Sequence, residues 1–294
     1  MGVMTRDYML EKRLMMLDPE LHRRFQDTVF AMQNILFRFR QLFPEFTDHS
    51  ALHSMTVIDF CNRLIGPEQI EKLNADMIYV LLVGCYLHDV GMGISEEQFR
   101  EFGKEIDFGD YYEKHPGADM GRIIRAFHQE FSAAFIRKFA EFLEIPTPEH
   151  ECAVIQVCRG HRVVDLFDRT EFPLHFTVPN GNEINLPYLA ALIRLADEID
   201  VAADRNPLML YDMESFADEH EIAYHKRHQS VQELVITEDA LTLLVRYVDP
   251  DTDQMVRTMV QKMEQTLQNC REAAQAGSPF RISQSKILIQ DITG

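Results

Sequence analysis

The chain has 294 residues, of which 46% are hydrophobic, and its formal charge at neutral pH is -18. This length fits one large domain or a main domain with an appendage, and the apolar content is sufficient for a core. The negative charge argues against nucleic-acid binding, because phosphate backbones require a basic surface. The longest apolar run, residues 77–87, is too short to cross a bilayer, and the N-terminal residues lack the apolar block of a signal peptide. We therefore expect a cytoplasmic protein without a membrane partner.

Apolar residues at three- and four-residue spacing predict helices from Asp7 to about Asp204. The predicted helices cover residues 21–42, a segment around 57–64 that ends at Gly66-Pro67, and residues 77–87, 120–144, 149–159 and 186–203. The run 77–87 is apolar on nearly all sides, which predicts the central buried helix. Residues 167–187 are rich in Pro, Asn and Gly, and Asn180-Gly181 predicts a short hairpin there.

The sequence pattern changes after Pro207. Alternating and β-branched residues predict strands at 234–236, 241–248 and 286–292, with a helix at 252–276 between the last two. The sequence thus predicts a mainly α fold, with a helical domain over residues 1–206 and a small α/β appendage over residues 207–294 packed on that core. The apolar residues of the appendage are compatible with a homodimer interface, although core packing explains them equally well.

Histidine and aspartate residues in separate helical segments form the most informative pattern. His88-Asp89 directly follows the most apolar helix, where a carboxylate is costly to bury unless a cation or several donors meet it. His53 begins an amphipathic helix, where a capping or core role competes with metal binding. Asp197 lies in another apolar helix and shares a face with Asp200 and Asp204, which a solvated stripe could also explain. Nitrogen and oxygen ligands of this kind suit a divalent metal that activates water.

The order His, His-Asp, Asp on a helical scaffold resembles the HD-domain superfamily of metal-dependent phosphohydrolases, over roughly residues 45–206. Segments similar to bacterial HD domains, including some attached to Hsp90-like ATPase modules, are residues 47–57, 87–92, 160–161 and 195–205. The resemblance implies an HD-domain helical bundle. It also implies a first metal ion, bound by His53, His88, Asp89 and Asp197.

Two later histidines, His128 and His161, match the order and context of the residues that bind a second metal in binuclear HD domains. The resemblance implies that Asp89 bridges both ions and that Asp89, His128 and His161 are catalytic. Alternatively, the two histidines bind substrate phosphate, act as general acid or cap helices. His49 is expected to lie behind the metal ligands, and His115 competes with His128 for the second site.

The function implied by the resemblance is hydrolysis of a nucleotide or another small phosphate ester by metal-activated water. The expected cofactor is one or two divalent ions, with manganese, iron, magnesium, nickel and zinc all compatible with the ligands. Arg162, beside His161, and Arg205, beside the aspartate face, are the candidates for binding substrate phosphate. The motifs of the HD-GYP cyclic-dinucleotide phosphodiesterases are replaced by Met92-Gly93 and Arg162-Val163-Val164, which argues against cyclic-di-GMP as the substrate.

Two other functions remain open at this point. The domain could sense a nucleotide and signal to a partner, such as an ATPase protein, without turnover; the chain has no Gly-rich phosphate loop of its own. The same ligands would also permit a di-iron centre with oxidative chemistry, as in a few relatives of this fold. The aromatic segment Phe99–Gly117 is expected to be a lid or a surface loop, and Tyr111, Tyr112 and Phe127 stack on a base or belong to the core.

Overall fold

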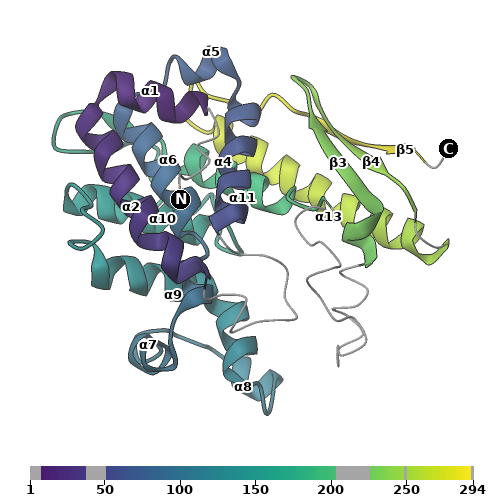
Figure 1. Ribbon diagram of the computed structural model, residues 1–294, viewed down its shortest axis with the longest axis horizontal. Coiled ribbons are helices and arrows are strands. Elements are labelled where there is room, and N and C mark those ends of the chain that lie inside the picture. Colours follow the sequence, from purple (N-terminus) through teal and green to yellow (C-terminus); the bar gives the residue numbers. More distant parts are fainter. Residues whose placement is uncertain (1–7, 38–50, 203–225, 248–249, 293–294) are drawn as a thin grey trace.

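The computed structural model describes residues 8–37, 51–202, 226–247 and 250–292. Helices form the main body, and a small three-stranded sheet lies to one side, beside the long helix α13 (Figure 1). The mainly α fold with a small α/β appendage is confirmed. The boundary proposed between residues 206 and 207 lies outside the described residues, so the division into two domains stays a prediction.

Most helices lie in the first two thirds of the sequence, and most strands lie near its C-terminal end. The helices of the main body are α1 (Met9–Leu17), α2 (Pro19–Phe37), α4 (Ala51–Ile65), α5 (Pro67–Ile70), α6 (Ala75–Leu87), the 3₁₀ helix η1 (Val90–Gly93), α7 (Glu96–Phe102), α8 (Tyr111–Lys114), α9 (Met120–Phe139), α10 (Pro148–Gly160) and α11 (Leu186–Glu198). The appendage contains β3 (Val231–Ile236), β4 (Ala240–Val245), α13 (Pro250–Gln275) and β5 (Lys286–Asp291). In its sheet, β4 pairs antiparallel with β3 and parallel with β5.

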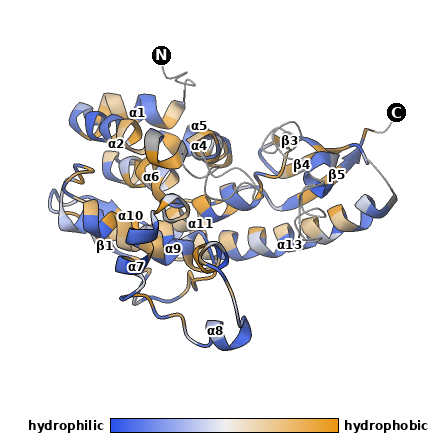
Figure 2. Cartoon of the chain, turned by 60° about the horizontal axis from the view of Figure 1, so that its bottom comes forward, coloured by the Kyte–Doolittle hydropathy of each residue, from blue (hydrophilic) through white to orange (hydrophobic). Residues whose placement is uncertain are grey.

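Helix α6 is the centre of the main body, as its uniformly apolar sequence predicts. Residues 76–87 are all buried, and α1, α2, α4, α10 and α11 pack around the helix (Figure 2). The side chain of Asn74 caps the helix by accepting a hydrogen bond from the Met77 amide at 2.9 Å. Together with η1, the segment Ala75–Gly93 is long and apolar enough to span a membrane, but its apolar stretch is wholly buried inside the protein.

The hairpin predicted at Asn180-Gly181 is present and is anchored on the first turn of α6. It consists of β1 (Phe176–Thr177) and β2 (Glu183–Ile184), and Gly181 has a φ of 89°, which favours glycine. The buried carboxylate of Asp76 accepts hydrogen bonds from Asn180 Nδ2 at 3.0 Å and Asn182 Nδ2 at 2.7 Å. It also contacts His150 Nε2, at the start of α10, at 2.8 Å. A polar cluster therefore joins three elements at the end of α6 opposite His88.

Two predicted helices are too long. The helix expected over 120–144 ends at Phe139, and the chain then turns through Glu144, whose φ of 53° is left-handed. The helix expected over 186–203 ends at Glu198, so Asp200 does not continue the helical face that begins with Asp197. Asp204 lies outside the described residues. The early end of α11 matters for the site, because it frees Asp200 to turn back toward α4.

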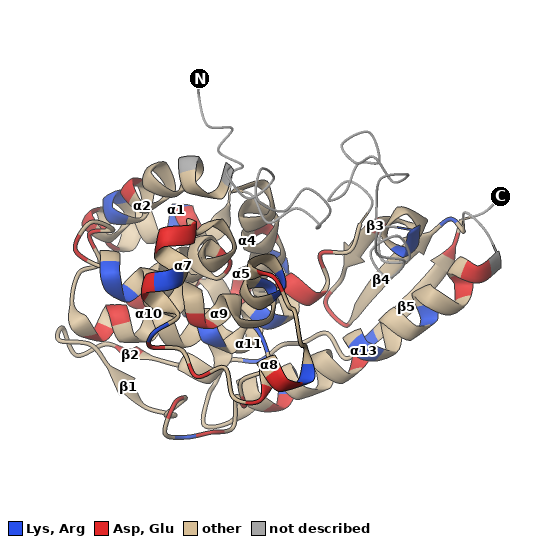
Figure 3. Ribbon diagram, turned by 90° about the horizontal axis from the view of Figure 1, so that it is seen from below, with Lys and Arg blue, Asp and Glu red and all other residues tan. Residues whose placement is uncertain are grey.

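Both acidic and basic residues lie on the outer helices (Figure 3). Many are paired within one helix at a spacing of four residues, such as Arg100 with Glu96 and Arg257 with Asp253. Exposed pairs of this kind contribute little to stability. They do show that many basic residues in the described part of the chain already lie beside acids, consistent with a surface that does not attract a phosphate backbone.

Candidate metal centre

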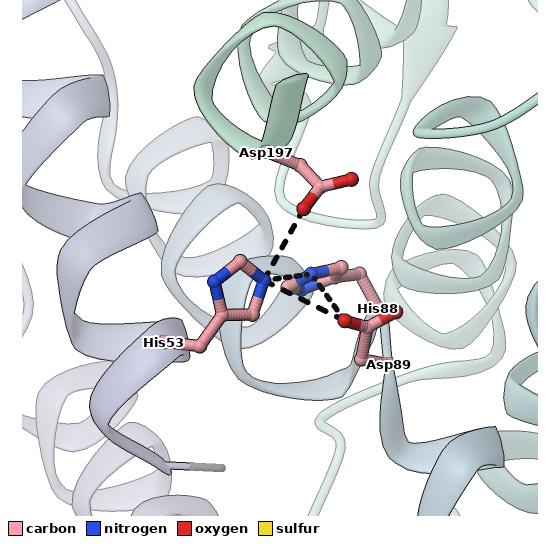
Figure 4. A group of neighbouring side chains, drawn as sticks. All are labelled: His53, His88, Asp89 and Asp197. Carbon is pink, nitrogen blue, oxygen red and sulfur yellow. Dashed lines mark hydrogen bonds and ion pairs between the residues drawn. The ribbon is translucent and has the colours of Figure 1, made fainter. Parts of the chain in front are cut away.

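Four of the predicted ligands converge from three helices. His53 lies in the first turn of α4, His88 and Asp89 lie between α6 and η1, and Asp197 lies in the last turn of α11 (Figure 4). Each offers one ligand atom, and the four atoms lie within 4.8 Å of one another. His53, His88 and Asp89 are buried, whereas Asp197 is partly exposed.

The distances within this first group are those of direct polar contacts between the side chains. His53 Nε2 lies 3.2 Å from Asp197 Oδ1, 3.2 Å from His88 Nε2 and 3.5 Å from Asp89 Oδ2. His88 Nε2 lies 3.2 Å from the same Asp89 oxygen. Two imidazole nitrogens and two carboxylate oxygens therefore point at one small volume, as Figure 4 shows.

A second group shares Asp89 with the first. Its other oxygen, Oδ1, lies 3.3 Å from His128 Nε2 and 3.6 Å from His161 Nε2. The two imidazole nitrogens are 2.9 Å apart. All three side chains are buried, and their ligand atoms also lie within 4.8 Å of one another. The two oxygens of Asp89 thus face two different groups, so this one carboxylate is available to both of them.

The backbone fixes the protonation of three of these imidazoles. His88 Nδ1 lies 2.9 Å from the carbonyl of Cys85, His128 Nδ1 lies 2.8 Å from that of Arg125, and His161 Nδ1 contacts that of Cys158. A carbonyl oxygen can only accept, so each Nδ1 carries a proton, and a neutral ring held in this way turns its Nε2 lone pair inward. Between two neutral rings, lone pairs only 2.9 to 3.2 Å apart would repel one another. A cation between them would remove that repulsion, so the donor set fits a metal.

The fourth imidazole is oriented by a carboxylate. His53 Nδ1 donates to the buried Asp200 Oδ2 at 2.6 Å, which leaves Nε2 for the site. Asp197 and Asp200 therefore lie on the two nitrogen atoms of the same ring. A carboxylate behind a metal-binding histidine fixes the ring orientation and makes the ring a stronger ligand. The sequence analysis placed Asp200 on the aspartate face without this role, although its spacing from Asp197 was the available signal.

The elements that carry the ligands are joined by backbone contacts. Ser132 Oγ donates to the His88 carbonyl at 2.7 Å and accepts from the Gly91 amide at 2.9 Å, which ties η1 to α9. Gly91 has no room for a side chain, because an added Cβ would lie 2.3 Å from the His128 carbonyl oxygen. The close approach of η1 and α9 thus brings His128 near Asp89.

The titration of two site residues favours metal binding at neutral pH. Burial raises the pKa of the Asp197 carboxyl, but in the metal-free protein a protonated His53 outweighs burial through its hydrogen bond and its charge, and holds the pKa well below its ordinary value. Burial and the neighbouring His88 and His128 hold the pKa of His161 well below the ordinary histidine value. A metal needs an ionised carboxylate and a neutral imidazole, and both pKa shifts are in the direction that favours these forms.

The remaining candidate residues are not brought to this centre by the described part of the structure. Arg162 is exposed in the turn after α10, one residue beyond His161. His115 is exposed and stacks on Tyr111, with ring centroids 4.3 Å apart, rather than competing with His128. Arg205 and His49 lie outside the described residues. The proposed phosphate-binding roles of the two arginines stay predictions.

Comparison with known proteins assigns the family. A family model described as HD-CE matches residues 43–274, which is most of the chain. The chain belongs to the HD-CE family. No curated protein and no solved structure gives a significant match to this HD-CE protein. An HD-type domain is therefore confirmed, and the association with Hsp90-like ATPase modules stays a prediction.

Proposed function

We propose that this HD-CE protein is a metal-dependent phosphohydrolase that acts on a nucleotide or another small phosphate ester. The observation that supports the proposal best is the position of Asp89. One of its oxygens faces His53 and His88, and the other faces His128 and His161. Buried carboxylates do not adopt such surroundings without compensation, and a pair of cations provides it.

The ligand sets of the two groups define what they can hold. The first group offers two imidazoles and two carboxylates, and the second offers two imidazoles and the shared Asp89. When bound, a divalent ion supplies water of lowered pKa and polarises a phosphoryl oxygen. Mixed nitrogen and oxygen ligands accept manganese, iron, nickel or zinc, and they do not select strongly among these ions.

His128 and His161 are the candidates for holding the proton that a leaving group needs. A histidine that protonates a leaving group must carry a proton on Nε2, because Nδ1 of His128 and His161 is committed to a backbone carbonyl. Nε2 of His161 lies 3.6 Å from Asp89 Oδ1 and 2.9 Å from His128 Nε2, inside the second group. For His161 we therefore favour a ligand role over the general-acid role.

The charge of the protein bears on the substrate. A phosphate ester approaching a chain of net charge -18 needs local positive charge. Bound metal ions would provide part of it at the buried centre. Arg162 and Arg205 remain the proposed side chains for the outer phosphate oxygens, since guanidinium groups match phosphate geometry. The identity of the base or alcohol stays open in this proposal.

The experiment is a substrate panel with metal-loaded protein. Purified protein is incubated with Mn²⁺, Mg²⁺ or Ni²⁺ and with nucleoside mono-, di- and triphosphates and p-nitrophenyl phosphate, and released phosphate is measured. We expect turnover that is lost in Asp89→Ala and Asp197→Ala. The matched control is Glu198→Ala, because Glu198 follows Asp197 on the same helix but its carboxylate pairs with Lys262 at 3.0 Å.

Other outcomes identify the competing functions. Nucleotide binding without any product would indicate a sensor, and oxygen consumption by iron-loaded protein would indicate oxidative chemistry. The hydrolase proposal fails if metal-loaded protein releases phosphate from none of the esters tested, including the chromogenic one.

A further inference from the structure

The break in helix α9 adjoins the second group of ligands. Phe127 lies inside the helix but has φ -122° and ψ 18°, outside the helical range, and His128 follows it directly. Helix breaks have local causes, such as a side chain inserted into the backbone ladder. Here His128 Nδ1 takes the Arg125 carbonyl at 2.8 Å as its own partner. The break and the orientation of His128 are therefore one feature.

Three aromatic residues surround the break. Phe108, which precedes α8, and Tyr111, in α8, both meet Phe127 edge-on, with ring centroids 5.0 and 5.1 Å away. We call Phe108, Tyr111 and Phe127 the aromatic clamp. Edge-to-face pairs at these distances are directional contacts that add to simple burial. The ring of Phe127, a candidate for stacking on a base, is thus already in contact with two other aromatic rings.

The aromatic clamp contacts α9 on both sides of the break. On the N-terminal side, Tyr111 Oη donates to the Arg122 carbonyl at 3.3 Å. On the C-terminal side, Phe108 meets the buried Phe131, with ring centroids 6.3 Å apart. The clamp therefore holds two helix segments at a fixed angle, rather than lying on one of them.

The location of the clamp places its main effect on the second group. Helix α8 lies away from α4 and α11, which carry His53 and Asp197, in Figures 1 and 2. His128 is the ligand next to the break, and its Nε2 lies 3.3 Å from Asp89 and 2.9 Å from His161. A change in the angle of α9 would move His128 directly, whereas His53 and Asp197 lie on α4 and α11 rather than on α9.

We infer that the aromatic clamp positions His128 and thereby sets the affinity of the second metal site without determining that of the first. Phe108, Tyr111 and Phe127 are positioning residues in this view, since they act through His128. The inference rests on the proposed function, because it requires a second ion at Asp89, His128 and His161. It also gives the segment Phe99–Gly117 a role as support for the metal centre.

The test is a stepwise titration of the metal-free protein with Mn²⁺. Calorimetry measures the affinity for each ion, and electron paramagnetic resonance shows whether two bound ions form a coupled pair. We expect two bound ions in the wild type, with the spectrum of a coupled pair. Phe108→Ala and Phe127→Ala should lower the affinity for the second ion about tenfold or more, while the affinity for the first ion changes less than twofold. The spectrum of the coupled pair should be replaced by that of a single ion. Tyr111→Phe, which removes only the bond to Arg122, should have a smaller effect in the same direction.

The controls separate positioning from general damage. Phe142→Ala removes a ring of the same size that is 72% exposed beyond the end of α9, and it should bind both ions as the wild type does. Circular dichroism checks that each variant is folded, and Phe127→Leu, which retains apolar volume at the break, should restore part of the second affinity. The inference is overturned if the clamp variants bind both ions normally or lose both equally, or if the wild type binds only one ion. A wild type that binds no ion would instead contradict the proposed function.

Discussion

Replacing Gly91 by alanine should damage both stability and the metal centre. A Cβ at this position would lie 2.3 Å from the His128 carbonyl oxygen, 2.7 Å from the Ser132 amide nitrogen and 2.9 Å from Phe131 Cβ. Two of these atoms belong to the backbone of α9, and the third is the Cβ atom that is bonded directly to it. No flexible side chain can move aside to make room.

The size of the effect follows from these distances. Ordinary contacts of a Cβ begin at 3.4 Å, so the His128 carbonyl must move away by about 1.1 Å, which is 3.4 minus 2.3. Overpacking of a tight core costs about 1–3 kcal/mol. We expect the upper end, about 3 kcal/mol, because the shift also strains the hydrogen bond from Gly91 to Ser132. A displacement of about 1 Å at a catalytic ligand is sufficient for roughly a 100-fold loss of turnover.

Gly93 provides a matched control in the same short helix. Its added Cβ would meet the Ile35 carbonyl at 3.1 Å, so the neighbour needs to move by only a few tenths of an ångström. Gly93→Ala should therefore cost less than about 1 kcal/mol and leave metal binding intact. Urea unfolding gives the free energies of unfolding, and calorimetry with Mn²⁺ gives the metal affinity. Equal stability and equal Mn²⁺ affinity in Gly91→Ala and Gly93→Ala would refute the reasoning.

Three further predictions concern other parts of the molecule. Asp200→Asn should lower the affinity for the first metal ion by about 10- to 100-fold, because an amide is a weaker acceptor for the His53 proton than a carboxylate. Glu198→Gln is the control, and a metal titration measures the affinity of both variants. Burial raises the pKa of Asp76, but hydrogen bonds from His150, Asn182 and Asn180 outweigh it and hold the pKa at about 2. The unfolded carboxyl has a higher pKa, so its stabilisation is present above about pH 4 and lost toward pH 2; the stability of Asp76→Asn should fall less steeply over that range, and parallel acid-unfolding curves would count against it. Removing bound metal with a chelator should lower the melting temperature, and re-adding Mn²⁺ at about 100 times its dissociation constant should restore about 2.7 kcal/mol; an unchanged melting temperature would argue against a specific site in the folded state.

Local sequence patterns were sufficient to place the main helices, whereas the site also required the family resemblance. The all-apolar run at α6 and the Asn180-Gly181 turn each depend on neighbouring residues only. The His and Asp residues of the site lie far apart in the sequence, and the family resemblance was needed to assign them to one site. The structure then brought His53 and Asp197 to the same volume as His88.

The features that the sequence did not reveal depend on contacts between distant segments. Asp200 reaches His53 because α11 ends at Glu198, whereas the periodicity of the sequence continues to Ala203. The break at Phe127 lies within an unbroken amphipathic pattern, and rings from another segment surround it. No local rule predicts such packing, because its cause is a tertiary contact.

The central claim is that these buried histidines and aspartates hold divalent cations. The most direct measurement is anomalous diffraction from crystals of the protein loaded with Mn²⁺, recorded at a wavelength where manganese scatters anomalously. The account predicts one peak among His53, His88, Asp89 and Asp197, and a second among Asp89, His128 and His161. Ordered side chains in the arrangement described here, with no anomalous peak among them under saturating Mn²⁺, would contradict it.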